Sequence, residues 1–428
     1  MTQRYDTYKD SGVQWLGEIP GHWGCVPFKS VFELGKGLSI TKGDLKDSGV
    51  KVISYGQIHS KNNKFSYVVP ELYRFVDETY LTTNPQSLAN KEDFLFADTS
   101  EDTVGSGNFV RIDNEETTFA GYHTIIARNK KVQSGNYLAY LLQSKKWKMQ
   151  IWVQVHGVKL FSITRSILNS TKLLLPPLSE QRSIVSFLDA KCGKIDEWVT
   201  KKQKEVEHLQ ELKQRVIADA VTRGLNPHVK MKATNIPWIK EIPEHWEIKR
   251  SKYLLKLLTE STKRIRKIGL ENIESNTGKF ILTKTIFDGD GVDFDCGDIL
   301  YGKLRPYLNK VWLAEFDGNA VGDFYVYRAI NGYFNSFAKY LLMSSCFVGI
   351  SNASTYGAKM PRVSSQFIHS LHFPVPHLSE QKQIVSYLDA KTSKIDKLIA
   401  NITKEIDCIK EYKQRLISDV VTGQIKVC

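Results

Sequence analysis

A segment of 20 residues occurs twice in this chain, at positions 200 residues apart. LSEQRSIVSFLDAKCGKIDE begins at Leu178 and LSEQKQIVSYLDAKTSKIDK begins at Leu378, and 14 of the 20 residues are identical. A shorter repeat precedes each copy, because WLGEIPGHW begins at Trp15 and WIKEIPEHW begins at Trp238. The chain is therefore an internal duplication, and any fold that it adopts must contain the repeated unit twice.

The two copies are alike at their ends and different in their middles. The shorter repeat has an offset of 223 residues and the longer repeat an offset of 200, so the second copy lacks 23 residues that the first contains (223 − 200 = 23). Similar ends that enclose different middles predict one shared scaffold with one constant partner and two different ligands.

The longer repeat predicts a helix in each copy. Prolines precede each Leu-Ser-Glu-Gln, so that Ser179 and Ser379 are expected as N-caps, with Glu180 and Glu380 in the first turn, where the helix dipole favours a carboxylate. The first helix is expected to run over residues 178–223, which corresponds to a rod of about 69 Å.

Apolar residues recur along both helices at alternating steps of three and four, which is the pattern of a coiled coil. Lys202 and Lys213 interrupt this stripe in the first copy and Lys413 interrupts it in the second. Chain direction favours an antiparallel pair, because the second helix starts from the second domain. The residues expected to pair are Ile195, Val199, Val206, Leu209, Val216, Ile395, Ile399, Ile402, Ile406, Ile409 and Leu416.

The segments between the helices are rich in aromatic and β-branched runs, such as KVISYGQI from Lys51, DFLFADTS from Asp93 and DFYVYRAI from Asp323, which predict strands. Short helices are expected from Tyr137 and Phe337. The predicted fold class is α+β, with two strand-rich domains separated by two long antiparallel helices in a pseudo-twofold arrangement. The expected ranges are 1–176 and 226–375 for the domains, and 177–225 and 376–428 for the helices.

The net charge of +13 and the pI near 9.2 make a polyanion, and first of all nucleic acid, the expected partner. A generally basic surface is the alternative. The polar N-terminus and the short, interrupted apolar stretches give no signal peptide or membrane span, so a cytoplasmic location is expected. The six cysteines show no CxxC pair and are expected to be reduced thiols.

A loop in each copy pairs a glycine with a lysine, in HGVKLFSIT from His156 and YGAKMPRVS from Tyr356. A lysine beside a backbone that can approach closely suits a phosphate contact. A tight turn with a solvated lysine is the alternative. The candidate DNA contacts are Lys159, Lys359 and Arg362 in these loops, Lys303 and Arg305 in GDILYGKLRPYLNK, and Tyr122 and His123 in the first domain.

With these motifs, the chain resembles the specificity subunits of type I restriction-modification systems over nearly its whole length. The LSEQ helix starts followed by IVxxLD and KID, the IPxHW segments and GDILYGKLRPYLNK carry the resemblance. It implies two target recognition domains that each read half of a bipartite site in double-stranded DNA. It also implies helices that bind two methyltransferase subunits, and restriction or translocase subunits that join through the complex. S-adenosylmethionine, ATP and magnesium are then expected in those partners and no cofactor in this chain.

Motifs of catalysis are missing from the sequence. Asn or Asp followed by two prolines and an aromatic residue, which adenine methyltransferases need, does not occur. The phosphate-loop pattern at Gly297, Gly302 and Lys303 continues with Leu304 where magnesium binding needs Ser or Thr. No metal site or catalytic residue is predicted. The alternatives are a nucleic-acid enzyme with two fused catalytic halves and a purely structural coiled-coil scaffold.

Overall fold

The computed structural model describes residues 4–130, 133–157, 159–262, 264–357 and 359–427. It forms two compact units, the first made of Met1–Lys201 and Glu405–Cys428 and the second of Lys202–Lys404. Each of the five clusters of buried apolar side chains draws its residues from one unit alone. The two units therefore have separate cores.

In the first unit, one four-stranded antiparallel sheet has the order β10-β8-β12-β4 and a mixed sheet has the order β6-β5-β11-β7. Three two-stranded pairs are β1-β2, β13-β9 and β14-β3. The strands are β1 (Tyr8–Asp10), β2 (Glu18–Pro20), β3 (Gly24–Pro27), β4 (Phe32–Lys36), β5 (Val50–Ile53), β6 (Arg74–Val76), β7 (Leu88–Ala89), β8 (Phe94–Ala97), β9 (Thr99–Ser100), β10 (Phe109–Arg111), β11 (Thr118–Ala120), β12 (Thr124–Asn129), β13 (Phe161–Ser162) and β14 (Lys172–Leu175).

The second unit repeats this topology with fewer strands. Its antiparallel sheet β18-β24-β21-β22 corresponds to β4-β12-β8-β10, and β19-β23-β20 forms a smaller mixed sheet. The strands are β15 (Met231–Ile236), β16 (Ile239–Pro243), β17 (Glu247–Arg250), β18 (Leu255–Leu258), β19 (Lys267–Ile268), β20 (Gly291–Phe294), β21 (Ile299–Gly302), β22 (Val311–Leu313), β23 (Gly318–Val321), β24 (Phe324–Ala329) and β25 (His372–Val375). The predicted α+β class, duplicated within the chain, is confirmed.

The short helices predicted from Tyr137 and Phe337 are each two helices. Ser144 and Ser344 have extended backbone between the two, and each side chain caps the following helix by accepting a bond of 3.3 Å from a backbone N–H. The helices are α1 (Phe28–Val31), α2 (Tyr55–Ile58), α3 (Tyr80–Thr83), α4 (Gly135–Gln143), α5 (Lys145–Trp152), α6 (Arg165–Ser170), α8 (Asn335–Met343), α9 (Ser345–Ala353) and α10 (Ser365–Ser370). The 3-10 turns are η1 (Lys42–Asp44), η2 (Pro70–Leu72), η3 (Pro85–Ser87), η4 (Ser251–Tyr253), η5 (Leu270–Asn272) and η6 (Pro306–Leu308).

The long helices are α7 (Leu178–Arg223), of 46 residues, and α11 (Leu378–Val421), of 44 residues. Both begin at the leucine, so the prediction that Ser179 and Ser379 are N-caps is wrong. These serines lie inside the first turn, because the carbonyls of Pro177 and His377 already accept bonds from backbone N–H groups four residues later. The acidic first turn is confirmed.

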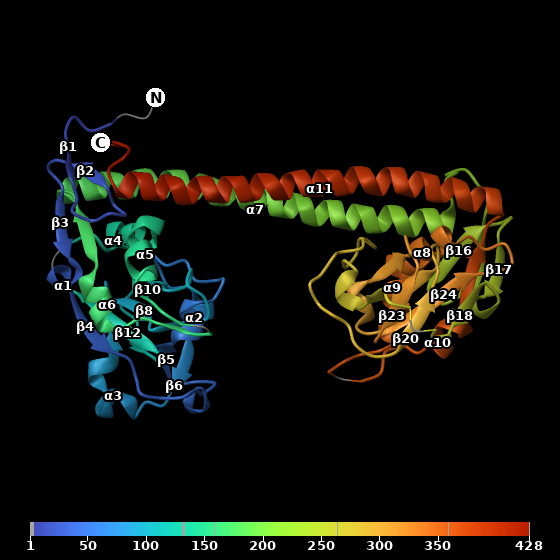
Figure 1. The fold of residues 1–428 in the computed structure, drawn as a ribbon, viewed down its shortest axis with the longest axis horizontal. Helices are drawn as coiled ribbons and strands as arrows, with labels where there is room; N and C mark the ends of the chain where they lie inside the picture. Colours follow the sequence, from blue (N-terminus) through green and yellow to red (C-terminus); the bar gives the residue numbers. More distant parts are fainter. Residues whose placement is uncertain (1–3, 131–132, 158, 263, 358, 428) are drawn as a thin grey trace. The chain divides into compact units, whose positions relative to one another are not determined.

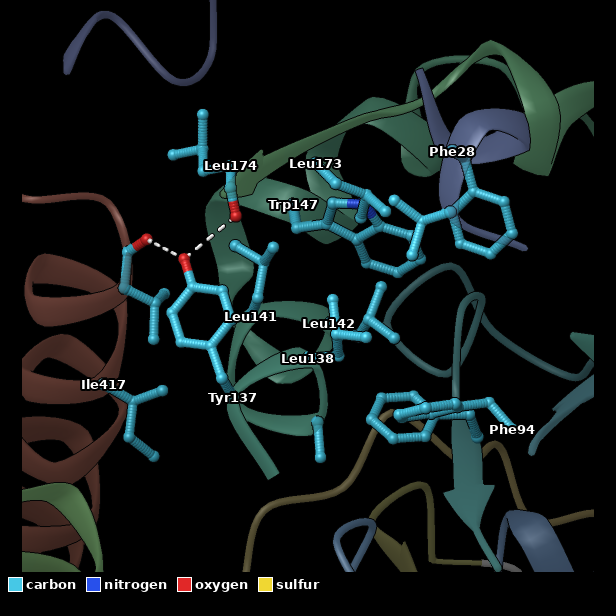
Figure 2. Packing of buried hydrophobic residues seen from close by; sticks show 14 of the residues in the cluster. Phe28, Phe94, Tyr137, Leu138, Leu141, Leu142, Trp147, Leu173, Leu174 and Ile417 are labelled. Carbon is cyan, nitrogen blue, oxygen red and sulfur yellow. Dashed lines mark hydrogen bonds between the residues drawn. The ribbon is translucent and has the colours of Figure 1, made fainter. Parts of the chain in front are cut away.

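Within the first unit, α4 packs between the sheet and the long helices (Figure 1). Tyr137 and Leu141 of α4 share a buried cluster with Ile417 of α11 and with Phe94 of β8, and Figure 2 shows α4 between them. The Tyr137 hydroxyl lies 3.0 Å from the carbonyl oxygen of Leu174 and 3.4 Å from that of Val421. The start of α4 thus ties the strand-rich part of the unit to the long helices.

In each unit the long helices run antiparallel. Ile184 and Leu188, near the start of α7, share a core with Val421, near the end of α11, in the first unit. The second unit mirrors this arrangement, with Ile384 and Leu388 packed beside Val221. All eleven residues that the apolar stripe predicted for helix pairing are buried or half-buried.

Two lysines that interrupt the apolar stripe form ion pairs between the helices. In the second unit Lys213 Nζ lies 2.7 Å from Asp396 Oδ1, and in the first unit Lys413 Nζ lies 2.7 Å from both oxygens of Asp196. The two pairs are equivalent under the offset of 200 residues. They join the aspartates of the repeated KID segment to lysines of the opposite helix, so these two lysines take part in helix pairing although they interrupt the apolar stripe.

The other repeated polar residues bind the domain that precedes each helix. Glu180 accepts hydrogen bonds from Tyr5, from Trp23 Nε1 at 3.1 Å and from His22 Nε2 at 2.8 Å. In the second unit Glu380 lies 2.9 Å from His245 Nε2. The IPxHW repeat therefore folds against the LSEQ repeat, although more than 130 residues separate them.

Two further contacts also join each long helix to the domain that precedes it. The Tyr140 hydroxyl donates to Asp189 at 2.6 Å, and the Tyr340 hydroxyl donates to Asp389 at 2.6 Å. These aspartates belong to the repeated LD, and the tyrosines to α4 and α8. The repeated segment thus makes the same contacts with the preceding domain in both units, which explains why its residues are alike in the two copies.

Candidate nucleic-acid interface

In the second unit, the candidate contacts gather where β21 and β24 meet the loop after α9. Asp323, directly before β24, accepts two hydrogen bonds from Arg362, of 2.9 and 3.0 Å, and lies 3.9 Å from Lys303 Nζ. This carboxylate raises the pKa of the Arg362 guanidinium. Two of the predicted contacts therefore share one acidic partner and form a partly exposed, charged platform.

Arg305 and Lys359 are exposed, and Lys359 belongs to the same loop as Arg362. Arg305 has a left-handed backbone (φ +51°), and its N–H donates to the Pro361 carbonyl at 2.7 Å. The loop closes where Tyr356 and Arg362 exchange backbone bonds of 3.0 Å. The structure thus brings Lys303, Arg305 and Arg362 together, and Lys359 lies three residues before Arg362 in the same loop.

The first unit places its candidates at the equivalent strand ends. His123 lies directly before β12, and its Nδ1 is 3.1 Å from Asp98 Oδ1. The ring of Tyr55 lies 5.6 Å from the ring of Tyr122 and 5.4 Å from that of His123. Exposed Lys159 precedes β13, which pairs with β9 just after Asp98. The three predicted residues of this unit lie along one edge.

The two units differ at these strand ends but agree in the supporting layer. Arg128 pairs with Asp93 at 2.9 Å, and Arg328 pairs in the same way with Asp298 at 2.7 Å. At the strand ends, the residues in equivalent positions carry charges of opposite sign. Asp98 follows β8 in the first unit, whereas Lys303 follows β21 in the second unit. The shared layer holds the fold, and the strand ends present different chemistry.

His59 also belongs to this edge, because its Nε2 lies 2.8 Å from the carbonyl oxygen of Thr99 in β9. The sequence did not single out Asp98, Asp323, Tyr55 or His59. Both aspartates are adjacent to predicted strands. Because binding residues often lie in the loops that follow or precede strands, this position could have identified them. Tyr55 and His59 come from the region of α2, and nothing local in the sequence connects them with residues 98–123. Their place is a product of tertiary folding.

The described ranges contain neither a candidate metal site nor a helix suited to span a membrane. These residues contain no group of three or more His, Cys, Asp or Glu side chains suited to hold a metal ion. None of the helices in the same ranges combines the length and the apolar character needed to cross a membrane. Cys25, Cys192, Cys296, Cys346 and Cys408 are free thiols, and Cys428 lies outside the described residues.

Comparison with known proteins agrees with this geometry. The family described as type I restriction modification DNA specificity domain matches residues 20–208 and 243–407. The MjaVIII specificity subunit of Methanocaldococcus jannaschii is 25% identical over 328 residues, which cover 71% of this chain and 73% of the relative. The StySPI specificity subunit of Salmonella potsdam is 21% identical over 449 residues, which cover 96% and 90%.

Among solved structures, a chain from a study of complex assembly and conformational transition of the type I R-M system has the same fold. Its TM-score is 0.67 at 15% sequence identity, and the match covers 94% of this chain and 98% of that one. The family match extends over both units and most of the chain. This chain therefore belongs to the type I restriction modification DNA specificity domain family, as its repeated motifs predicted.

Proposed function

We propose that the chain is a non-catalytic specificity subunit that recognises a bipartite, asymmetric DNA site, with one half-site read by each unit. The observation that carries this proposal is one topology repeated in two units whose strand ends differ in charge, with Asp98 and His123 in the first and Lys303 and Asp323 in the second. Identical readers would favour a symmetric site. Readers with different polar groups favour two different half-sites, because base edges are distinguished by their donors and acceptors.

The long helices are proposed to bind two copies of one methyltransferase subunit, with restriction subunits joining through that complex. Large apolar side chains remain exposed on them: Leu212 (46%), Leu398 (50%) and Tyr412 (53%). Leu212 and Tyr412 are equivalent under the offset of 200, and Leu398 is equivalent to half-buried Trp198. A repeated apolar surface supports two equal partner sites. S-adenosylmethionine, ATP and magnesium would belong to the partners.

Purified alone, the chain is expected to transfer no methyl group from S-adenosylmethionine to DNA, and to bind two methyltransferase subunits at saturation. Analytical ultracentrifugation of the mixture gives the stoichiometry, and labelled S-adenosylmethionine gives the activity. Replacing Leu212 and Leu398 by serine should weaken one of the two sites. Saturation by a single partner copy, or methylation by the isolated chain, would contradict the proposal.

The exposed lysines of the two loops are expected to bind phosphate. Among the described residues neither Lys159 nor Lys359 forms an ion pair, so each charge is available to DNA. Lys159→Ala should lower the slope of log affinity against log salt concentration by about 0.9, and so should Lys359→Ala. Preferred sequences should stay the same. Lys404→Ala, on an exposed face of α11, is the matched control, and a changed base preference in either loop variant would assign that lysine to base reading.

A further inference from the structure

The connection between β8 and β10 in the first unit, residues 98–108, combines an exposed tip with tightly held ends. Val104 at the tip is 69% exposed, and Glu101 and Asp102 beside it are exposed. The base of the loop is buried at Ser106 and Gly107. A rigid loop that projects polar and apolar groups from the edge of a sheet is the arrangement that recognition sites commonly use.

A buried lysine determines the hydrogen bonding at the base of this loop. Lys148 Nζ donates to Asn108 Oδ1 at 2.6 Å, Asn108 Nδ2 lies 3.2 Å from His59 Nδ1, and His59 Nε2 lies 2.8 Å from the Thr99 carbonyl oxygen. Lysine can only donate, so the oxygen of Asn108 must face it and the amide NH2 must face His59. His59 Nδ1 then accepts, and the proton is on Nε2, which donates to Thr99. One ammonium group thus fixes an amide orientation, a tautomer and a loop carbonyl.

Other bonds hold the rest of the loop. The Trp152 indole N–H donates to the Ser106 carbonyl at 3.0 Å, and the Ile163 N–H donates to the Asp98 carbonyl at 2.7 Å. The Gly105 N–H donates to Asp102 Oδ1 at 2.6 Å. The loop is therefore fixed from α5, from the Lys159 loop and by its own side chains, and its tip has a defined shape before any ligand binds.

Packing alone does not account for a lysine at position 148. Burial lowers the pKa of Lys148 to about 8, with nearby Asp102 acting in the opposite direction. In the described part of the chain no carboxylate lies within ion-pair distance of its Nζ. A buried cation without a paired anion is unfavourable, whereas an apolar side chain would suit the neighbouring Phe65 ring, 5.4 Å away, equally well.

The second unit holds the equivalent connection by other means. Between β21 and β22 the chain forms η6, with Arg305 in a left-handed conformation. The position 200 residues after Lys148 is Val348. The Lys148 network is therefore a property of the first unit, and its consequences should be confined to one half-site.

We propose that residues 98–108 are the base-reading loop of the first unit, and that Lys148 is a positioning residue for this loop, acting through Asn108 and His59. The proposal rests on the proposed function and adds to it the element that reads one half-site. Lys148 is buried and does not itself touch DNA. It sets the geometry of Thr99 and, through the loop base, the direction in which the tip approaches a groove.

The first test replaces Lys148 by Met, which keeps the length of the side chain and removes its donors. Lys145→Met is the matched control, because Lys145 is an exposed lysine of the same helix. The full-length protein would select from duplex DNA libraries in which each half-site is randomised in turn. Lys148→Met should lower the preference for the best first half-site about tenfold. The second half-site and the Lys145→Met profile should be unchanged.

A second variant gives a signature that a purely structural role would not produce. In Asn108→Asp the carboxylate still accepts from Lys148 but cannot donate to His59 Nδ1. The network then closes only when both imidazole nitrogens carry protons, so the first half-site preference of this variant should recover as the pH is lowered. Wild-type preference should stay constant below about pH 7, where Lys148, whose pKa burial lowers to about 8, keeps its ammonium charge. Among the described residues, the groups that face His59 include Asn108, the Thr99 carbonyl, the Tyr55 ring, the Asp102 carboxylate, which lies with the His59 ring beside Gly105, and, through Asn108, Lys148.

The outcomes are separable. Equal loss in both half-sites, no loss in Lys148→Met, or no recovery of Asn108→Asp at low pH would each overturn the positioning role. If Lys148→Met does not fold, as shown by loss of its cooperative thermal transition, the pH series of Asn108→Asp decides. If the wild-type chain with its methyltransferase partner selects no sequence at all, the proposed function fails instead.

Discussion

Replacing residues 32–163 by the equivalent segment of a relative is expected to change one half-site of the recognised DNA completely and to leave the other unchanged. The physical reason is the separation of the cores, because every buried apolar cluster lies within one unit. The exchanged segment contains both main sheets of the first unit, while β3, β14, α1 and α6 remain as a frame. Mapping methylated positions in a genome that carries the chimera measures both half-sites at once.

The chimera must keep the hydrogen bonds that join the exchanged segment to α7. The hydroxyl of Tyr140 donates to Asp189 and the backbone N–H of Ser134 donates to Gln181, so the donor segment should carry a tyrosine at the position of Tyr140. A second chimera with phenylalanine there should bind DNA with the same preference but lower stability. A change in both half-sites would show that the units do not read independently, and a change in neither would place recognition outside residues 32–163.

Removing the charge of Lys213 is expected to destabilise the second unit by about 3 kcal/mol, because a buried ion pair loses one partner and leaves a charge with poor solvation. The side chains of Lys213 and Asp396 are 7% and 17% exposed. Asp396 keeps a second contact, with Lys279 Nζ at 3.1 Å, which limits the loss. Lys213→Met preserves the aliphatic stem, so the measured change reports the charge. Hydrogen exchange of the α7 amides in residues 202–223 measures it locally.

The duplication supplies the matched control, since Lys413→Met removes the equivalent charge in the first unit. There Lys413 is 22% exposed and Asp196 is 63% exposed, so water screens the pair and the expected loss is about 0–1 kcal/mol. Adding Asp396→Asn to Lys213→Met should recover part of the stability. Equal losses in the two single variants would mean that burial does not determine the strength of these pairs.

Several features followed from the sequence because they depend on local periodicity. The repeat predicted two helices, and the ends of α7 are the residues expected from the pattern, Leu178 and Arg223. Apolar steps of three and four marked residues that are buried or half-buried. The break of the predicted shorter helices at Ser144 and Ser344 was missed, because a single serine that is extended and caps the next helix looks like any helical serine in a pattern of apolar residues.

The sequence by itself determined the duplication, the family, the long helices and the strand-rich domains, since each of these follows from residue patterns within short segments. The tertiary structure alone decided the partners of the repeated polar residues. Lys213 interrupts an apolar stripe in the sequence, yet it pairs with Asp396, 183 positions away. The chain of bonds from Lys148 to Thr99 likewise joins three separate segments. Hydrogen bonds and ion pairs act over about 3 Å, and only the folded chain brings such distant residues within that range.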